Sequence, residues 1–361
     1  MTAHRIVVHS TSLDLLRAIA AVPGADASNT NLLLGCVVDD AQDDSRSAHA
    51  EEDEGDANER PDQHTKLLVS VWEGNELRLL FTKLDWSICK LVSPVPPSQI
   101  PTLALPLVPL LVQHLLTLAP FSTNPSLLRS ITGPIVLIDE FLSRWPHPAK
   151  PATAPPLIPC STRSAPPPIS FPPSHTFQRV DVHSMPQGDL AALANLLSDF
   201  YGNHPDSPRL EEAAAISHVK AKQRHNTFWL YRAPSVGADD LAAAVAPVAF
   251  LATGRATPRT VAIRMVYVAP SHRGQSIAQR MVSHVTRSHL LTADPLPLNL
   301  DNLPPVEIED GETRWGRKVE VCLFAEPENA AARRAYGKVG FREEEERWCT
   351  RNLEGVEAGH W

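Results

Sequence analysis

Two stretches of the sequence hold residue types whose spacing could support catalysis. In the first, Ser271-His272-Arg273-Gly274-Gln275-Ser276 follows an apolar run at Met265 to Val268 and precedes apolar residues at helical spacing from Ile277 onward. This pattern predicts a strand, a tight loop and a helix. The first turn of a helix carries N–H groups without intrahelical partners, and Gly274 lets the backbone approach a ligand closely. The loop suits a pyrophosphate, although an ordinary strand-to-helix connection would look similar.

The second stretch, Glu320 to Phe341, predicts another strand, at Val321 to Ala325, and a helix that follows Asn329. This helix carries Tyr336 and ends at a glycine. A phenol can donate a proton to a leaving group, so Tyr336 is a candidate general acid. The alternative is that its ring packs in the core with the hydroxyl satisfied there.

Together the two stretches resemble the GNAT superfamily of acyl-CoA N-acyltransferases. The family's cofactor motif, Arg/Gln-x-x-Gly-x-Gly/Ala, is similar to Arg273-Gly274-Gln275-Ser276-Ile277-Ala278. Its Asn-x-x-Ala-x-x-x-Tyr-x-x-x-Gly-Phe motif is matched by Asn329, Ala332, Tyr336, Gly340 and Phe341. The resemblance covers about half of the chain, and both motifs occur in the family's order on the expected elements.

The resemblance implies an N-acetyltransferase that moves an acetyl group from acetyl-CoA directly to an amine, with Tyr336 protonating the departing thiolate. It also implies a set of cofactor-binding residues: Val266, Tyr267, Val268, Arg273, Gly274, Gln275, Ser276, Ile277, Ala278, Asn329 and Ala332. Within this set the backbone at Val266 and Val268 should face the pantetheine and the thioester. Arg273 should contact phosphate, or else cap the loop with its charge in water.

Ser276 stands where the family motif normally has glycine. If the backbone there adopts an unusual dihedral, the side chain weakens cofactor binding, unless its hydroxyl donates to the phosphate. The alternative function is therefore a catalytically inactive acyl-CoA-binding or interaction protein of the same fold. A third reading is an assembly protein recruited through the acidic and proline-rich segments.

The general base and the acceptor remain open. Glu320, Glu326, His272, Tyr267 or a water chain could take the proton of the amine. Glu343 to Glu346 indicates a charged strand edge, or a surface that attracts a cationic amine. The acceptor could be a small amine, an amino acid, an antibiotic-like compound or a protein, because variable loops form such pockets.

The helices and strands expected around these residues indicate an α+β fold for residues 176–361. The resemblance implies a GNAT-like, mostly antiparallel sheet flanked by helices. Expected strands lie at 176–183, 226–231, 247–253 and 261–268, and expected helices at 187–201 and 209–222. Residues 292–318 interrupt the link from the cofactor helix to the next strand. They either border the acceptor site or form a passive surface loop.

The elements expected in residues 1–145 indicate a smaller accessory α+β domain. It resembles the N-terminal half of some two-part GNAT proteins, in which the sequence pattern of the family is weak. A hairpin is expected at 66–83, and helices at 12–22, 102–119 and 136–145. Residues 39–64 hold eleven acids against two arginines, which predicts a disordered acidic insertion rather than a docking site for a basic partner. Residues 146–175 contain eleven prolines and predict a semi-rigid linker with neither helix nor sheet, rather than a segment that binds a proline-recognising partner.

Composition limits the remaining function classes. The acidic insertion alone carries a charge of −9, so the rest of the chain is near +1 against a total of −8, and no long basic patch indicates nucleic acid. The five cysteines are scattered without a CxxC pair, which favours a reducing compartment and no metal site. The N-terminus lacks signal-peptide architecture, and prolines interrupt the apolar stretch at 100–121, so a cytoplasmic protein without a membrane span is expected. A nuclear location and the oligomeric state stay open.

Overall fold

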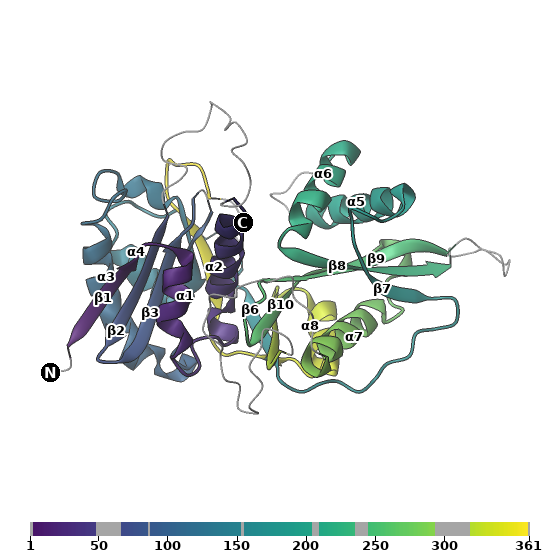
Figure 1. The fold of residues 1–361 in the computed structure, drawn as a ribbon, viewed down its shortest axis with the longest axis horizontal. Helices are drawn as coiled ribbons and strands as arrows, with labels where there is room; N and C mark the ends of the chain where they lie inside the picture. The colour runs from purple at the N-terminus through teal and green to yellow at the C-terminus, as the bar shows by residue number, and fades with distance from the viewer. Residues whose placement is uncertain are drawn as a thin grey trace.

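The computed structural model describes residues 3–47, 66–85, 87–152, 155–203, 209–234, 245–292 and 318–359. These residues form two sheets, one centred in each half of the chain, with helices on both faces of each sheet (Figure 1). The fold is thus α+β with two mostly antiparallel sheets, as the sequence predicts. None of the helices in the described ranges is both long and apolar enough to cross a membrane.

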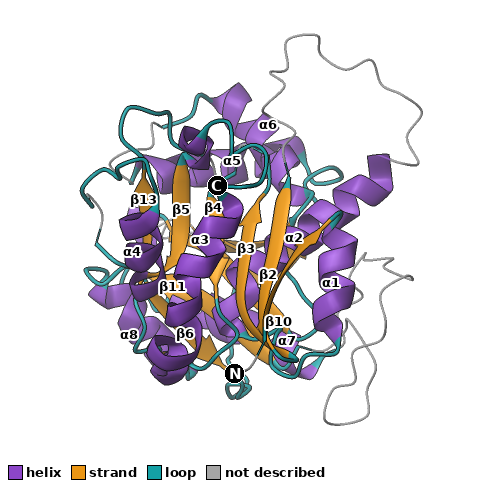
Figure 2. Cartoon of the chain, turned by 90° about the vertical axis from the view of Figure 1, so that its left-hand side faces the viewer, coloured by secondary structure: helices purple, strands orange, loops and turns teal. Residues whose placement is uncertain are grey.

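The first sheet has the strand order β1-β2-β3-β4-β5-β13, and only β4 and β5 pair in parallel (Figure 2). Its strands are β1 (His4–His9), β2 (Leu67–Glu73), β3 (Glu76–Lys83), β4 (Cys89–Val92), β5 (Ser130–Pro134) and β13 (Trp348–Asn352). Side chains alternate between its faces: Val69 and Phe81 pack with α3 (Val108–Leu115) and α4 (Ile135–Arg144). Leu68 and Leu80 pack with α1 (Ser12–Ala20) and α2 (Ser28–Ser47) on the opposite face.

The second sheet has the order β12-β6-β11-β10-β9-β8-β7, and only β10 and β11 pair in parallel. Its strands are β6 (Ile158–Thr162), β7 (Thr176–Val180), β8 (Asn226–Pro234), β9 (Val245–Gly254), β10 (Thr260–Val268), β11 (Glu320–Ala325) and β12 (Arg342–Glu343). One face is covered by α5 (Gln187–Gly202) and α6 (Glu212–Gln223). The other face is covered by α7 (Ile277–Leu291) and α8 (Ala330–Val339).

The two halves repeat one order of helices and strands. The run β1 α1 α2 β2 β3 β4 α3 β5 α4 β6 in the first half corresponds to β7 α5 α6 β8 β9 β10 α7 β11 α8 β12 in the second, when short 3₁₀ and π turns are set aside. In both runs the parallel pair consists of the fourth and fifth strands. The repeat agrees with the expected two-part organisation.

Each half gives one strand to the sheet of the other. Strand β6 leaves the first half to pair with β11 and β12, whereas β13 returns from the second half to pair with β5. The expectation that residues 146–175 form neither helix nor sheet is therefore wrong over β6. Pro159 is tolerated there because it supplies an acceptor: its carbonyl accepts a hydrogen bond from the N–H of Glu344 at 2.9 Å.

The part of the proline-rich stretch that follows β6, residues 163–175, is packed along α7, and we call it the strap. Nη1 of Arg287 donates to the Pro166 carbonyl at 2.8 Å, and Nη1 of Arg280 donates to the Ser170 carbonyl. The ring of Phe171 lies 5.7 Å from that of His284 on α7. Figure 1 shows the strap passing beneath α7 on its way from β6 to β7.

The acidic insertion also differs from expectation, because α2 continues through Ser47. Asp43 lies 3.0 Å from Nε2 of His225 and 3.3 Å from Nε of Arg224, both from the second half. Asp40 accepts from Ser12 at 2.7 Å and lies 3.0 Å from Nζ of Lys66. The sequence shows the excess of acids but not the partners that order residues 39–47, and residues 48–65 lie outside the described ranges.

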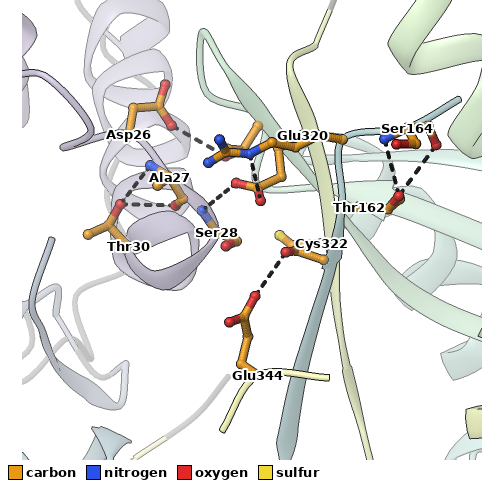
Figure 3. A network of polar contacts seen from close by, with 12 residues as sticks. Asp26, Ala27, Ser28, Thr30, Thr162, Ser164, Glu320, Cys322 and Glu344 are labelled. Atoms are coloured by element: carbon orange, nitrogen blue, oxygen red, sulfur yellow. Dashed lines mark hydrogen bonds and ion pairs between the residues drawn. The ribbon is translucent and has the colours of Figure 1, made fainter. Parts of the chain in front are cut away.

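Helix α2 stands between the two halves and joins them through buried polar contacts (Figure 1). Just before it, Asp26 accepts hydrogen bonds from Oγ1 of Thr257 at 2.5 Å and from the N–H of Arg259 at 2.9 Å. Figure 3 shows Ser28 beside Glu320, whose carboxylate accepts from the N–H of Ser28 at 2.9 Å. Burial raises the pKa of Asp26 despite these donors. The halves therefore share strands, core and polar contacts.

The expected helix at 102–119 is shorter than the sequence suggests. Prolines at 101, 106 and 109 divide the segment into a π turn (Ile100–Ala104), a 3₁₀ turn (Leu105–Leu107) and α3. Each proline removes an N–H donor, so the regular α-helical ladder extends only over Val108–Leu115.

Candidate active site

The parallel strands β10 and β11 separate part-way along their length. They pair only from Thr260 to Ala262, opposite Glu320 to Cys322, although β10 continues to Val268 and β11 to Ala325. A bulge between Ile263 and Met265 shifts the register of β10 against β9 just beyond this point. The facing edges beyond Ala262 therefore keep backbone groups that are not used by the β10–β11 ladder.

The predicted loop follows β10 at this open end. A 3₁₀ turn (Pro270–His272) leads to Arg273, Gly274 has φ +81°, and Ser276 precedes α7 with φ +59° and ψ +18°. An added Cβ at Gly274 would meet no heavy atom within 4 Å, so glycine is needed there for its backbone conformation rather than for space. The structure thus places the predicted residues 273–278 together at the first turn of a 15-residue helix.

The first turn of α7 suits an anion. The N–H of Arg280 donates to the carbonyl of Ser276 at 3.0 Å and begins the helical ladder, and the side chain of Ser276 makes no capping bond. The N–H groups that precede Arg280 are the ones that α-helix geometry leaves without intrahelical acceptors. They lie at the positive end of the helix dipole, where a phosphate is stabilised.

Arg273 folds back onto β10. Its Nε donates to the carbonyl of Val268 at 3.1 Å, and its guanidinium lies 5.7 Å from the ring centroid of Tyr267. No carboxylate pairs with it in the part of the chain that the structure describes. Arg273 therefore lies between the loop and the strand edge, on the very carbonyl that was expected to face the pantetheine.

The predicted β10 residues divide between the two faces of the sheet. Val266 and Val268 pack toward α7 and α8, whereas Tyr267 is buried on the α5 face with its ring 6.4 Å from that of Phe200. The side chain of Tyr267 thus contributes to the core. Only its backbone belongs to the strand edge.

Tyr336 lies on α8, whose start is fixed by Asn329. Oδ1 of Asn329 accepts from the N–H of Ala332 at 3.0 Å, so these two motif residues form the N-terminal cap of α8. The ring of Tyr336 packs 6.2 Å from that of Phe341, and its hydroxyl has no hydrogen-bond partner within the described ranges. Burial, reinforced by Cys160 and Glu326, raises the pKa of Tyr336 to about 12. The phenol is therefore protonated at neutral pH, as a proton donor must be.

Comparison with known proteins finds a family match within the second half of the chain. Residues 190–290 match the model of the acetyltransferase (GNAT) family. The chain contains a GNAT acetyltransferase domain. The matched range runs from α5 to α7 and includes the loop, but it ends before Tyr336. No curated protein matches the chain.

Comparison with solved structures finds a similar fold with a TM-score above 0.5, and further structures with lower scores. A Drosophila protein has a TM-score of 0.53 at 10% identity, over 99% of this chain and 100% of that one. A tandem GNAT protein from the clavulanic acid biosynthesis pathway has a TM-score of 0.47 at 14% identity, over 98% and 100%. A GCN5-related N-acetyltransferase from Sphaerobacter thermophilus has a TM-score of 0.45 at 14% identity, over 99% of each chain.

The side chains expected as candidates for a general base lie in different surroundings. Glu320 is buried at the paired end of β11 and accepts from Arg163 as well as from Ser28, so it holds the halves together (Figure 3). His272 is buried in the loop, with Nδ1 2.9 Å from Oγ of Ser271. Glu326 directly follows β11 at the open end and acts electrostatically on Tyr336. Of the four side chains considered, Glu326 is the one that directly follows β11 at the open end.

The glutamate run, Glu343 to Glu346, lies away from the loop at 273–276. It lines a cavity of about 1130 Å³ between the two halves, to which neither the loop nor Tyr336 contributes. Glu343 is paired with Arg333, with bonds of 2.7 and 3.0 Å, and Glu344 accepts from Ser161 at 3.0 Å. These two glutamates therefore have partners that fix their position.

No metal or disulfide chemistry is evident in the described ranges. They hold no group of three or more His, Cys, Asp or Glu side chains that could bind a metal ion. All five cysteines are free, and burial raises the pKa of Cys160 and Cys89 to about 12. Such thiols are protonated and poorly nucleophilic at neutral pH.

Sequence reasoning missed the strap as a neighbour of the GNAT domain's loop. His175 ends the strap, and Arg280 follows the loop by one helical turn. The aromatic and imidazole side chains Phe171 and His175, unusual in a proline-rich spacer, were the signal that this segment packs against the domain.

Proposed function

We propose that the second half of the chain is an N-acetyltransferase that transfers the acetyl group of acetyl-CoA directly to an amine. The observation that carries the proposal is the loop at 273–276, with two left-handed residues at the start of α7, beside the end where β10 and β11 separate. A phosphate group and an extended pantetheine arm need these two adjacent features.

The cofactor contacts follow from this arrangement. The N–H groups of residues 274–278 would surround the pyrophosphate, and the guanidinium of Arg273 would turn from Val268 toward it. That movement would release the Val268 carbonyl to accept a hydrogen bond from a pantetheine amide. Asn329 and Ala332, through the cap of α8, would set the distance between the pantetheine and Tyr336.

The chemical step needs no covalent enzyme intermediate. The neutral amine nitrogen attacks the thioester carbon, the C–N bond forms and the C–S bond breaks. The departing thiolate takes the phenolic proton of Tyr336, and the amine proton passes to Glu326 or to a water molecule. Free N–H groups on the β10 edge near Val266 and Val268 would stabilise the developing oxyanion.

Calorimetric titration with acetyl-CoA tests the proposal. Gly274→Glu puts a carboxylate in the loop and a side chain on a left-handed residue, so binding should be lost. Gly355→Glu is the matched control, because Gly355 also has a positive φ, +67°, with no heavy atom within 4 Å of an added Cβ, and it lies outside the loop.

Binding by the wild type and by the Gly355→Glu control, but not by Gly274→Glu, would support the cofactor site. Absence of binding by the wild type would overturn it. Acetyl-CoA binding without thiol release in the presence of a panel of small amines, amino acids and peptides would favour the inactive acyl-CoA-binding alternative.

A further inference from the structure

Arg280 is a cation beside the loop that the proposed reaction does not use. It lies one turn into α7, since its N–H bonds to the Ser276 carbonyl, and its side chain reaches the Ser170 carbonyl of the strap. Arg280 has no carboxylate partner among the described residues. Its Nε is buried and has no hydrogen-bond acceptor there. A buried, unsatisfied guanidinium donor is costly unless a ligand completes it.

His175 is a second polar side chain close to Arg280, which acts on it electrostatically. Its Nδ1 lies 2.9 Å from the hydroxyl of Tyr231, while its Nε2 has no hydrogen-bond partner within the described ranges. Burial lowers the pKa of His175, and the neighbouring charges of Arg280 and His272 lower it further. These effects favour the neutral form of His175 in the free protein, so Arg280 supplies the permanent positive charge at this place.

The strap holds His175 in position. Its carbonyls at Pro166 and Ser170 are bound by α7, and Phe171 packs between His284 and Tyr231, at ring distances of 5.7 and 5.8 Å. This packing brings the end of the strap to the end of the sheet where the loop lies. Residues of the strap therefore add to the surface around the loop at 273–276.

We propose that Arg280 and His175 form a second anion subsite that binds the 3′-phosphate monoester of the coenzyme A nucleotide. This inference rests on the proposed function. Coenzyme A carries this monoester in addition to its pyrophosphate, and a phosphate monoester has a charge near −2 at neutral pH. Arginine and protonated histidine match it with charge-assisted hydrogen bonds, and the bound dianion would favour the protonated form of His175.

The test compares coenzyme A with 3′-dephospho-coenzyme A in calorimetric titrations. The wild type should prefer coenzyme A by about tenfold or more, as one charge-assisted contact of ordinary strength would give. Arg280→Gln and His175→Gln should each reduce the preference to about threefold or less. Their affinity for 3′-dephospho-coenzyme A should match that of the wild type, which also shows that the variants are folded.

Arg287→Gln is the matched control. Arg287 holds the strap through the Pro166 carbonyl in the way that Arg280 does through Ser170, but it lies nearly two turns further along α7. If Arg287→Gln lowers the preference as much as Arg280→Gln does, the effect comes from a loosened strap and the subsite is wrong.

The two proposals fail in different ways. Equal wild-type affinity for coenzyme A and its 3′-dephospho form would overturn the subsite and leave the acetyltransferase proposal standing. No binding of either ligand would overturn both.

Discussion

Substitution of Ser276 tests whether the loop conformation serves a cofactor. Ser276 has φ +59° and ψ +18°, a left-handed conformation that costs an L-residue about 1–2 kcal/mol. Ser276→Gly removes that cost. It also makes the unfolded chain more flexible, which lowers the free energy of unfolding by about 0.5–1 kcal/mol. The net stabilisation is about 0–1.5 kcal/mol, so the variant should keep or improve its affinity for acetyl-CoA.

Ser276→Leu should have the opposite effect. The backbone strain remains, and a branched apolar side chain now covers the first N–H groups of α7, because Ser276 is the residue directly before that helix. Losing two charge-assisted hydrogen bonds of about 1.5–3 kcal/mol each would weaken binding by about 100-fold or more. Calorimetry with acetyl-CoA would no longer detect ordinary cofactor affinity.

The measurement needs both variants and a melting curve for each. A leucine variant that melts like the wild type but does not bind acetyl-CoA would support the loop as the phosphate site. A folded leucine variant with unchanged affinity would refute the reasoning, because the side chain could not then lie against the cofactor.

Further expectations concern catalysis, pH and assembly. Tyr336→Phe should keep acetyl-CoA affinity but lower kcat by about 10²–10⁴-fold in a thiol-release assay, and a pKa of about 12 implies that Tyr336 causes no alkaline loss below about pH 10. Burial raises the pKa of Asp39 from 3.8 to about 7, so its folded form holds the proton more tightly and its contribution to stability falls as pH rises from about 4 to 7. Asp39→Asn should flatten that fall in denaturant titrations, and an unchanged slope would contradict the assignment. The fragment 176–361 lacks β6 and also lacks β5, the partner of β13, so it should show no cooperative thermal transition. A sharp transition near that of the full chain would show that the exchange of strands between the halves is not needed for folding. Calorimetry should give one acetyl-CoA per chain, and two would mean that the first half also binds.

The elements that sequence reasoning found are those with strong local signals. Amphipathic spacing gave α5 and α7, and β-branched runs around glycine gave the β2–β3 hairpin. The loop at 273–276 was found because a glycine followed a buried strand and preceded a helix. Each of these signals lies within one short segment, so it can be recognised without knowing which distant residues pack against that segment.

The elements that it missed depend on distant partners. β6 contains a proline and lies in a proline-rich stretch, so only its pairing with β11 makes it a strand. β13 follows four glutamates, yet it enters the first sheet through β5. The acids at 39–44 read as a disordered loop until His225 and Arg224 of the other half are placed beside them.

The first half repeats the fold but differs from the second half in the connection that follows its fourth strand. Its parallel strands also separate early, since β4 and β5 pair only at Cys89–Ile131 and Lys90–Thr132. However, the connection after β4 carries prolines at 94, 96 and 97, where the second half has the loop that leads into α7. Proline has no N–H to offer a phosphate, so these three positions cannot supply the kind of donors found at the first turn of α7.

What the first half does supply is support for the second. It donates β6, which lies between β11 and β12, and α2, which brings Asp26 and Ser28 against β10 and β11. It also receives β13, so neither sheet is complete without the other half. The position of β11, and with it the point where β10 and β11 separate, is therefore set from both sides: by β10 of its own half and by β6 of the other. A change in the first half that shifts β6 should act on the proposed cofactor site through β11, although no first-half residue lies in the loop.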